Sequence, residues 1–191
     1  MKELETRILE DGVVLNNSIL KVDSFINHQI DVKLLRDISK YIASQFEGVT
    51  KVVTIETSGI AFALGIAQEY DDCPLVFAKK NKSAIVDLSS CYIATAKSFT
   101  RKTTSTITIS KNYLSKDDKV LIVDDFLAEG NAGLALVKMI KQAGATLVGF
   151  GVVIEKLFQG GRKRLEDEGV KVVACASISE FVDNKPVFVQ K

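Results

Sequence analysis

Short runs of β-branched and apolar residues recur along the chain, and each is followed by a turn and a helical pattern of apolar positions. This alternation predicts strands over residues 52–56, 74–79, 119–125, 146–155 and 170–178. Because the strands are apolar on both faces, the pattern predicts an α/β fold with a mostly parallel sheet flanked by helices. Ligands bind such sheets at the carboxyl ends of the strands, near the switch in strand order. Functional side chains are therefore expected directly after Glu56, Ala78, Asp125 and Glu155.

The stretch 83–110 departs from this alternation, because it is rich in hydroxyl and β-prone residues and lacks a clear helical pattern. Its end, TSTITIS, alternates like an antiparallel strand, so the stretch predicts a long hairpin or flexible arm. An insertion of this kind in a compact domain is often a functional lid. The chain has two prolines, no low-complexity tract and no repeat, and is expected to form one domain over residues 1–191.

Composition indicates which classes of protein the chain fits. Apolar residues make up 47% of the chain, charged residues 26%, and the net charge is +1, which is typical of a globular protein with no overall attraction to nucleic acid. The charged N-terminus lacks the apolar stretch of a signal peptide, and no membrane span is predicted, so a cytoplasmic location is expected. Cys73, Cys91 and Cys175 have no C-x-x-C spacing, and His28 is the single histidine. Neither a disulfide framework nor a zinc site is predicted.

Two local clusters of basic residues stand out against the even overall charge. One contains Lys79, Lys80 and Lys82, and the other occupies positions 162–164. From the residues alone, each cluster fits a solvated surface as well as it fits a functional site.

The stretch VLIVDDFLAEGNAG, from Val120 to Gly133, has the clearest chemical pattern. A buried strand places two adjacent carboxylates, Asp124 and Asp125, at the edge of the sheet, and a loop through Gly130 begins a helix. The N–H groups of such a loop and helix N-terminus form an anion site, and glycine permits close approach of the backbone. Two carboxylates beside a phosphate site suit a sugar phosphate, since they accept hydrogen bonds from ribose hydroxyls or help to hold magnesium indirectly. An Asp that caps a helix would explain one of the two acids only.

This stretch resembles the signature of the type I phosphoribosyltransferases, which bind 5-phosphoribosyl 1-pyrophosphate (PRPP). The resemblance implies that Asp124 and Asp125 bind the ribose diol and that a loop surrounds the 5′-phosphate. The residues of this phosphate loop are Ala128, Glu129, Gly130, Asn131 and Ala132.

The phosphate loop departs from the family pattern because it lacks threonine hydroxyls. Asn131 can replace a donor, whereas Ala132 cannot. Glu129 would repel a phosphate if it pointed inward, so its side chain is expected to face solvent. Ala128 stands where the hypoxanthine-guanine enzymes of the family have an aspartate proposed as general base, so no catalytic residue is assigned here. The family also implies a hood, formed by about residues 1–30 and the C-terminal segment, and a flexible loop over about 83–110.

Three further segments resemble family motifs. The segment ETSGI, residues 56–60, resembles the pyrophosphate-binding turn, and the lysines after the second strand resemble residues that meet the leaving pyrophosphate. Cations are needed where negative charge develops on a leaving group. The implied pyrophosphate contacts are Thr57, Ser58, Gly59, Lys79 and Lys80. Ser98 and Phe99 resemble the Ser-Tyr pair on the flexible loop, although phenylalanine lacks the tyrosine hydroxyl.

The segments VLNNSILKVDSFINHQID and VVIEKLFQGGR resemble the branch of the family that uses xanthine. The resemblance implies that Leu20 and Asn27 belong to the hood over the purine and that Lys156 reaches the base. A lysine favours an oxo-purine over an amino-purine because it supplies only donors and a positive charge. An amino group left unpaired at C2 costs about 1–3 kcal/mol, so guanine is expected to be a poorer substrate. Three rings could pack on the purine: Phe25, Phe126 and Phe158. For each of them, packing in the core is at least as plausible.

The resemblance therefore implies purine salvage, in which ribose 5-phosphate passes from PRPP to xanthine and yields xanthosine 5′-monophosphate and pyrophosphate. Magnesium would travel with PRPP, without a dedicated protein site, and a homodimer is the family expectation. Two alternatives stay open. An adenine phosphoribosyltransferase would share the fold, but Lys156 and Asn27 argue against a base with an amino group at C6. A PRPP-sensing, nucleic-acid-binding regulator would be expected to show an added domain or a strongly basic face.

Overall fold

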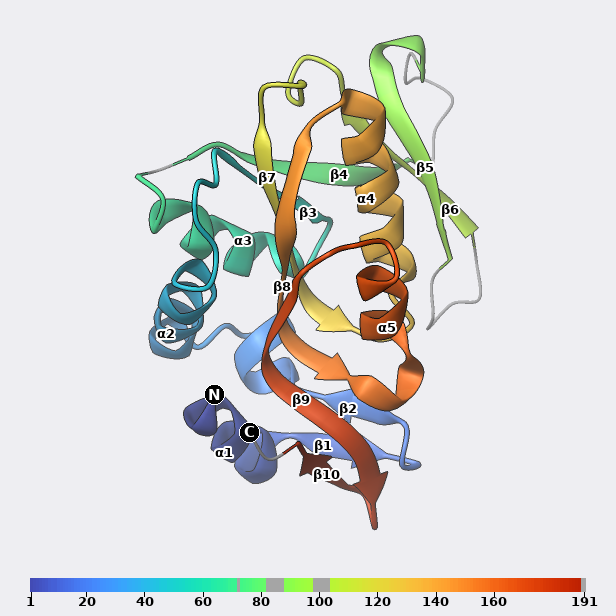
Figure 1. The fold of residues 1–191 in the computed structure, drawn as a ribbon. Coiled ribbons are helices and arrows are strands. Elements are labelled where there is room, and N and C mark those ends of the chain that lie inside the picture. The colour runs from blue at the N-terminus through green and yellow to red at the C-terminus, as the bar shows by residue number, and fades with distance from the viewer. Residues whose placement is uncertain (72, 82–87, 98–103, 190–191) are drawn as a thin grey trace.

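The computed structural model describes residues 1–71, 73–81, 88–97 and 104–189. A central sheet lies between two groups of helices, with α2 and α3 on one face and α4 and α5 on the other (Figure 1). The helices are α1 (Lys2–Asp11), α2 (Val32–Ala43), α3 (Gly59–Gln68), α4 (Asn131–Ala143) and α5 (Gly161–Glu166), with short turns of π- or 3₁₀-helix at Asp23–Asn27, Leu88–Ser90 and Leu157–Gln159.

The strands alternate with these helices as the sequence pattern predicts. They are β1 (Val13–Leu15), β2 (Ile19–Lys21), β3 (Lys51–Ile55), β4 (Leu75–Asn81), β5 (Cys91–Lys97), β6 (Thr104–Ser110), β7 (Lys119–Leu127), β8 (Thr146–Lys156), β9 (Val172–Val182) and β10 (Lys185–Phe188). In the described part of the chain, the main sheet has the order β10-β9-β8-β7-β3-β4-β6-β5. Its five central strands are parallel, while β5, β6 and β10 pair antiparallel. The predicted α/β fold is confirmed.

The switch in strand order falls between β3 and β7. From β3 the chain moves outward to β4, whereas from β7 it moves the opposite way to β8 and β9. The carboxyl ends of β3 and β7 therefore lie side by side, because the two strands are parallel neighbours. This is the place at which an open α/β sheet binds its ligand.

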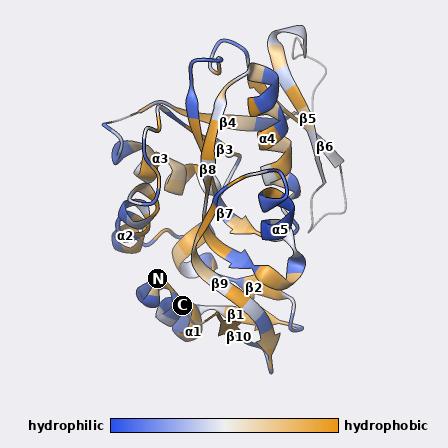
Figure 2. Cartoon of the chain, viewed as in Figure 1, coloured by the Kyte–Doolittle hydropathy of each residue, from blue (hydrophilic) through white to orange (hydrophobic). Residues whose placement is uncertain are grey.

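Both faces of β7 are buried, which explains why its sequence reads as a continuous apolar run. Leu121 and Val123 belong to the core cluster beneath α2 and α3, while Val120 and Ile122 belong to the cluster beneath α4. Apolar residues accordingly follow the central strands, and polar residues follow the outer sides of the helices (Figure 2). The strand continues to Leu127, two residues beyond its predicted end.

The stretch 83–110 forms a hairpin where it is described. β5 and β6 pair antiparallel from Cys91↔Ser110 to Lys97↔Thr104, which confirms the predicted antiparallel strand at TSTITIS. The hairpin lies beside α4 (Figure 1), and the Gln142 side chain accepts from the N–H of Ile93 and donates to its carbonyl. Ser98 and Phe99, the predicted flexible-loop residues, lie outside the described residues.

The segments expected to form the hood gather at one end of the sheet (Figure 1). α1, the β1–β2 hairpin, the Asp23–Asn27 turn and β10 meet there. Asn17, in the turn of the β1–β2 hairpin, and Asn184, in the turn between β9 and β10, join two of these segments, since each backbone N–H donates to the other's side-chain oxygen. Phe25 is fully buried, with the Arg7 guanidinium 5.5 Å from its ring centre, so its role is core packing. The role of the hood over a base, like the single-domain boundary, stays a prediction.

No helix in the described residues is long and apolar enough to cross a membrane.

Candidate active site

Two adjacent acids stand near the carboxyl end of β7, at the switch in strand order. Asp124 is almost completely buried, with 8% of its surface exposed, while Asp125 is half-buried. Asp124 Oδ1 accepts a hydrogen bond from the Asp125 backbone N–H at 3.0 Å. Asp125 is thus the more accessible of the two acids. The role of the pair as a ribose contact stays a prediction.

The predicted pyrophosphate turn lies directly against these acids. β3 ends at Ile55, the peptide bond between Glu56 and Thr57 is cis, and α3 begins at Gly59. A Cβ atom added to Gly59 would lie 2.5 Å from Thr54 Oγ1 and 3.0 Å from Asp124 Oδ1. A side chain at position 59 would therefore displace the Thr54 hydroxyl and crowd the acid, so this close approach requires glycine. Two segments that are distant in the sequence thus lie side by side.

The basic residues of β4 complete this edge of the sheet. Glu56 Oε1 accepts from the backbone N–H of Lys80 at 2.5 Å, which fastens the turn after β3 to β4. The side chains of Lys79 and Lys80 are exposed beside it, as is Thr57, whereas Ser58 is partly covered. The structure thus brings all the residues predicted to bind pyrophosphate to one edge of the sheet. Their binding of a ligand stays a prediction.

Burial raises the pKa of Asp124 well above its ordinary value, and the negative charge of Asp125 adds to the effect. The charge of Lys80 acts in the opposite direction, so this lysine is close enough to influence the acid. A ligand with hydroxyl groups at this position would meet a carboxyl group whose proton is held more tightly than usual.

The phosphate loop connects β7 to α4 and bends at Gly130, whose φ of 78° lies in the left-handed region. The Gly130 carbonyl accepts from the N–H of Leu134, which closes the first turn of α4. The loop rests on Gly161 of α5: Gly161 N–H donates to the Ala128 carbonyl at 3.0 Å, and a Cβ at position 130 would lie 3.1 Å from Gly161 Cα. Two glycines therefore allow the loop and α5 to touch through their backbones.

The polar side chains of the phosphate loop bond to each other. Glu129 is partly covered rather than turned fully into solvent, because Asn131 Nδ2 donates to its Oε2 at 2.9 Å. The Asn131 amide, predicted as a replacement phosphate donor, gives one N–H to this acid, and its contact with a phosphate stays a prediction. Ala128 and Ala132 are partly exposed on either side.

Lys156 ends β8 and lies between the central sheet and the hood. Its Nζ donates to the carbonyl of Ser18 at 2.9 Å, and 8% of the residue is exposed. The ammonium also lies 6.0 Å from the ring centre of Phe126, the residue after Asp125, and 5.6 Å from that of Phe181. Burial lowers the pKa of Lys156 below its ordinary value. The predicted base contact is thus adjacent to the predicted ribose contacts.

The other predicted base-site residues differ in exposure. Leu20 is buried in β2, with 7% exposed, while Asn27 is exposed at the end of the Asp23–Asn27 turn. Phe158 is 46% exposed and packs edge-on against Phe181, with ring centres 5.5 Å apart. Of the three candidate rings, Phe126 and Phe158 therefore remain available to a ligand.

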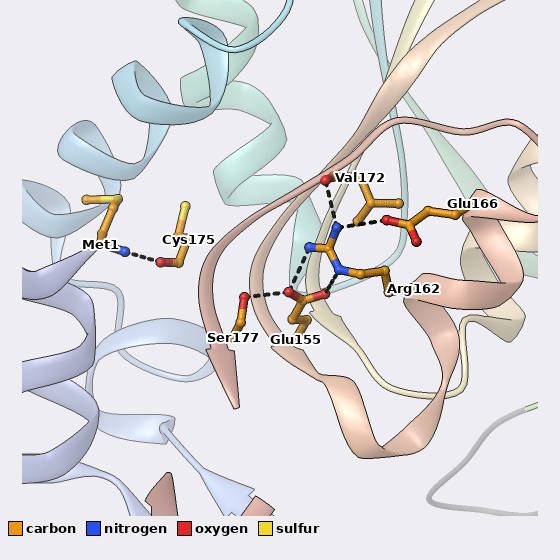
Figure 3. Close-up of polar contacts among 7 residues, drawn as sticks. All are labelled: Met1, Glu155, Arg162, Glu166, Val172, Cys175 and Ser177. Atoms are coloured by element: carbon orange, nitrogen blue, oxygen red, sulfur yellow. Dashed lines mark hydrogen bonds and ion pairs between the residues drawn. The ribbon is translucent and has the colours of Figure 1, made fainter. Parts of the chain in front are cut away.

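A buried ion pair next to Lys156 escaped the sequence analysis (Figure 3). Glu155 is 1% exposed, and the Arg162 guanidinium donates two hydrogen bonds to its carboxylate, of 2.8 and 2.7 Å. Ser177 Oγ donates to the same carboxylate, and Arg162 Nη1 donates to the Val172 carbonyl at 3.0 Å. Burial lowers the pKa of Arg162, but the hydrogen bonds and charges of Glu155 and Glu166 outweigh this and hold it above its ordinary value. The position of Glu155 at the end of an apolar strand could have predicted this ion pair, because a buried carboxylate needs a partner.

The basic cluster at positions 162–164 therefore divides three ways. Arg162 belongs to the buried pair, and Arg164 donates to the phosphate loop. The Lys163 side chain is 79% exposed, and its ion pair within the described residues is with Asp167. The solvated-surface interpretation holds for Lys163 alone.

Residues 21–188 match the model of the phosphoribosyl transferase domain. The chain belongs to the phosphoribosyltransferase family. Within it, the chain belongs to the xanthine phosphoribosyltransferase branch, as its relatives show. It is 50% identical to the xanthine phosphoribosyltransferase of Streptococcus uberis, covering 100% of this chain and 98% of the relative. It is 48% identical to xanthine phosphoribosyltransferase 2 of Clostridium botulinum, covering 98% and 100%.

Solved structures of adenine phosphoribosyltransferases share the fold. That from Rhodothermus marinus has a TM-score of 0.74 at 21% identity, covering 93% of this chain and 100% of the other. That from Saccharomyces cerevisiae has a TM-score of 0.72 at 21% identity, covering 92% and 99%. At this identity the likeness establishes the fold and carries no information on the base.

Proposed function

We propose that this enzyme transfers ribose 5-phosphate from PRPP to xanthine and releases xanthosine 5′-monophosphate and pyrophosphate. The observation that carries the proposal is the position of Lys156, whose ammonium lies over the ring of Phe126, next to the acid pair of β7. A donor for the base thus adjoins acceptors for the ribose. The full-length similarity to xanthine phosphoribosyltransferases supports the same base.

The PRPP half of the site is supported by its chemistry. Carboxylates near the end of β7 accept hydrogen bonds from ribose hydroxyls, and the N–H groups at the start of α4 suit the 5′-phosphate. Lys79 and Lys80 lie where negative charge would develop on the departing pyrophosphate. In the reaction, the bond from the anomeric carbon to the pyrophosphate oxygen breaks as a purine nitrogen bonds to that carbon. The purine loses the proton from that nitrogen.

The base half of the site favours an oxo-purine. Lys156 offers only donors, so an oxygen at C2 or C6 is satisfied, whereas the amino group of adenine would meet another donor. Leu20 covers the base from the hood, and Asn27 can both donate to it and accept from it. Guanine, which has one oxygen and one amino group, is expected to be the poorer substrate.

Magnesium, partners and location complete the proposal. Within the described residues, no group of three or more His, Cys, Asp or Glu side chains could hold a metal ion. Magnesium would travel with PRPP, bound by its hydroxyl and phosphate oxygens, with the β7 acids assisting indirectly. We place the enzyme in the cytoplasm as a homodimer, acting on small molecules without nucleic acid or membrane partners.

Asp125→Asn is expected to weaken PRPP binding about tenfold to a hundredfold, the loss that follows when hydrogen bonds to a charged acceptor worth about 1.5–3 kcal/mol disappear. Asparagine keeps the shape of the side chain but turns one acceptor into a donor. Calorimetric titration of the variant with PRPP and magnesium measures the effect.

Asp167→Asn is the matched control, because it removes the same charge from an exposed acid that pairs with Lys163 on α5. Its affinity for PRPP is expected to equal that of the unaltered enzyme. Equal affinities for all three proteins would refute the ribose role of Asp125.

A further inference from the structure

The phosphate loop contains an acid, Glu129, at the place where PRPP would bring a phosphate group. A carboxylate there opposes phosphate binding unless its charge is offset or held to one side. The structure holds it within the loop, since Asn131 Nδ2 donates to Glu129 Oε2 at 2.9 Å. The direction of this acid is therefore set by its neighbour.

A cation from another element is fastened to the same loop. Arg164 Nη1 on α5 donates to Asn131 Oδ1 at 2.9 Å and also to the backbone carbonyl of Glu129. The Asn131 amide thus bridges the two charges: its oxygen accepts from the guanidinium and its nitrogen donates to the acid. This chain of hydrogen bonds connects α5 to the only acidic side chain between positions 128 and 132.

Contacts of two neighbouring residues hold α5 in place, and they fix the backbone position of Arg164. The N–H of Gly161 donates to the Ala128 carbonyl at 3.0 Å, and Arg162 is anchored to the buried Glu155 at 2.7 Å. A preordered helix lowers the entropy cost of fixing an exposed arginine.

We propose that Arg164 is a positioning residue for PRPP, which acts through Asn131 to hold Glu129 away from the 5′-phosphate and to offset its charge. The inference rests on the proposed function, because it requires the phosphate loop to bind the 5′-phosphate of PRPP. Arg164 acts on the loop and not on the reacting atoms, so the effect is expected in PRPP affinity and not in base affinity.

Arg164→Ala is expected to raise the Kd for PRPP and for ribose 5-phosphate about tenfold, the loss typical of one charge-assisted hydrogen bond. The KM for xanthine is expected to stay unchanged. Lys163→Ala is the matched control, because it removes a cation from the same helix that meets Asp167 instead of the loop. Calorimetry with each ligand and steady-state kinetics provide the readouts.

A double-mutant cycle separates the proposed role from a general effect of α5. In the Glu129→Gln background, Arg164→Ala is expected to cost only about twofold, because the charge that it offsets is gone. Arg164→Gln, which keeps donors but not the charge, tests the same point if the alanine variant unfolds. The same loss in both backgrounds, or equal losses in PRPP and xanthine affinity, would overturn the inference.

The outcomes also separate the inference from the function on which it rests. Binding of PRPP by the unaltered enzyme with no change in Arg164→Ala would refute the role of Arg164 and leave the function intact. Absence of binding of either PRPP or ribose 5-phosphate to the unaltered enzyme would overturn both.

Discussion

Lys156→Met is expected to lower kcat/KM for xanthine about tenfold to a hundredfold while leaving PRPP affinity unchanged, because a hydrogen bond from a charged donor contributes about 1.5–3 kcal/mol. Methionine keeps the apolar stem against Phe126 and Phe181 but has no ammonium to meet an oxygen of the base. Steady-state kinetics with xanthine and adenine, together with calorimetric binding of PRPP, measure the effect. The preference for xanthine over adenine is expected to shrink.

Lys163→Met serves as the matched control, since it makes the same change on an exposed lysine of α5. Lys156 also bonds to Ser18 of the hood, so unfolding curves should accompany the kinetics. A variant that lost xanthine turnover and PRPP affinity in equal measure would contradict the assignment of Lys156 to the base.

Arg162→Met is expected to lower the free energy of unfolding by about 3–5 kcal/mol, because it leaves the buried carboxylate of Glu155 without its counter-charge. Within the described part of the chain, Ser177 is then the remaining side-chain donor to the Glu155 carboxylate. Chemical denaturation followed by circular dichroism measures the change. The adjoining Lys156 and the Gly161 contact with the phosphate loop should loosen with it.

The double variant Glu155→Gln with Arg162→Met tests the cause. A neutral glutamine is less costly to bury than an unpaired carboxylate, so the double variant is expected to be more stable than Arg162→Met alone. A loss below about 1 kcal/mol for Arg162→Met would mean that the pair behaves as an ordinary surface ion pair.

The parts of this site that could be predicted from sequence are those in which the chemistry is local. Asp124, Asp125 and Gly130 follow one another through a strand, a loop and a helix start, so their spacing alone indicates an anion and ribose site. The place of Gly59 and Lys80 beside them follows from a general rule, because parallel neighbours bring their carboxyl ends to one edge.

The parts that could not be predicted depend on contacts between distant segments. Lys156 bonds to Ser18 across 138 positions, and Arg164 reaches Asn131 across 33. Periodicity describes which side of an element is buried, but it does not say which polar groups meet across elements. The contact of Glu129 with Asn131 is local, but its connection through Asn131 to Arg164 of α5 could not be predicted for this reason.

The adenine alternative is not favoured, since proteins named for adenine resemble this chain at 21% identity and share its fold only. The regulator alternative gains no support either, because full-length relatives at 48–50% identity are named as enzymes.

The most direct test is a spectrophotometric assay of the purified enzyme with PRPP and magnesium, in which xanthine, guanine, hypoxanthine and adenine are offered in parallel. We expect xanthine to be used with the highest kcat/KM and guanine to follow it. The highest kcat/KM with adenine, or binding of PRPP without turnover of any base, would contradict the proposed function.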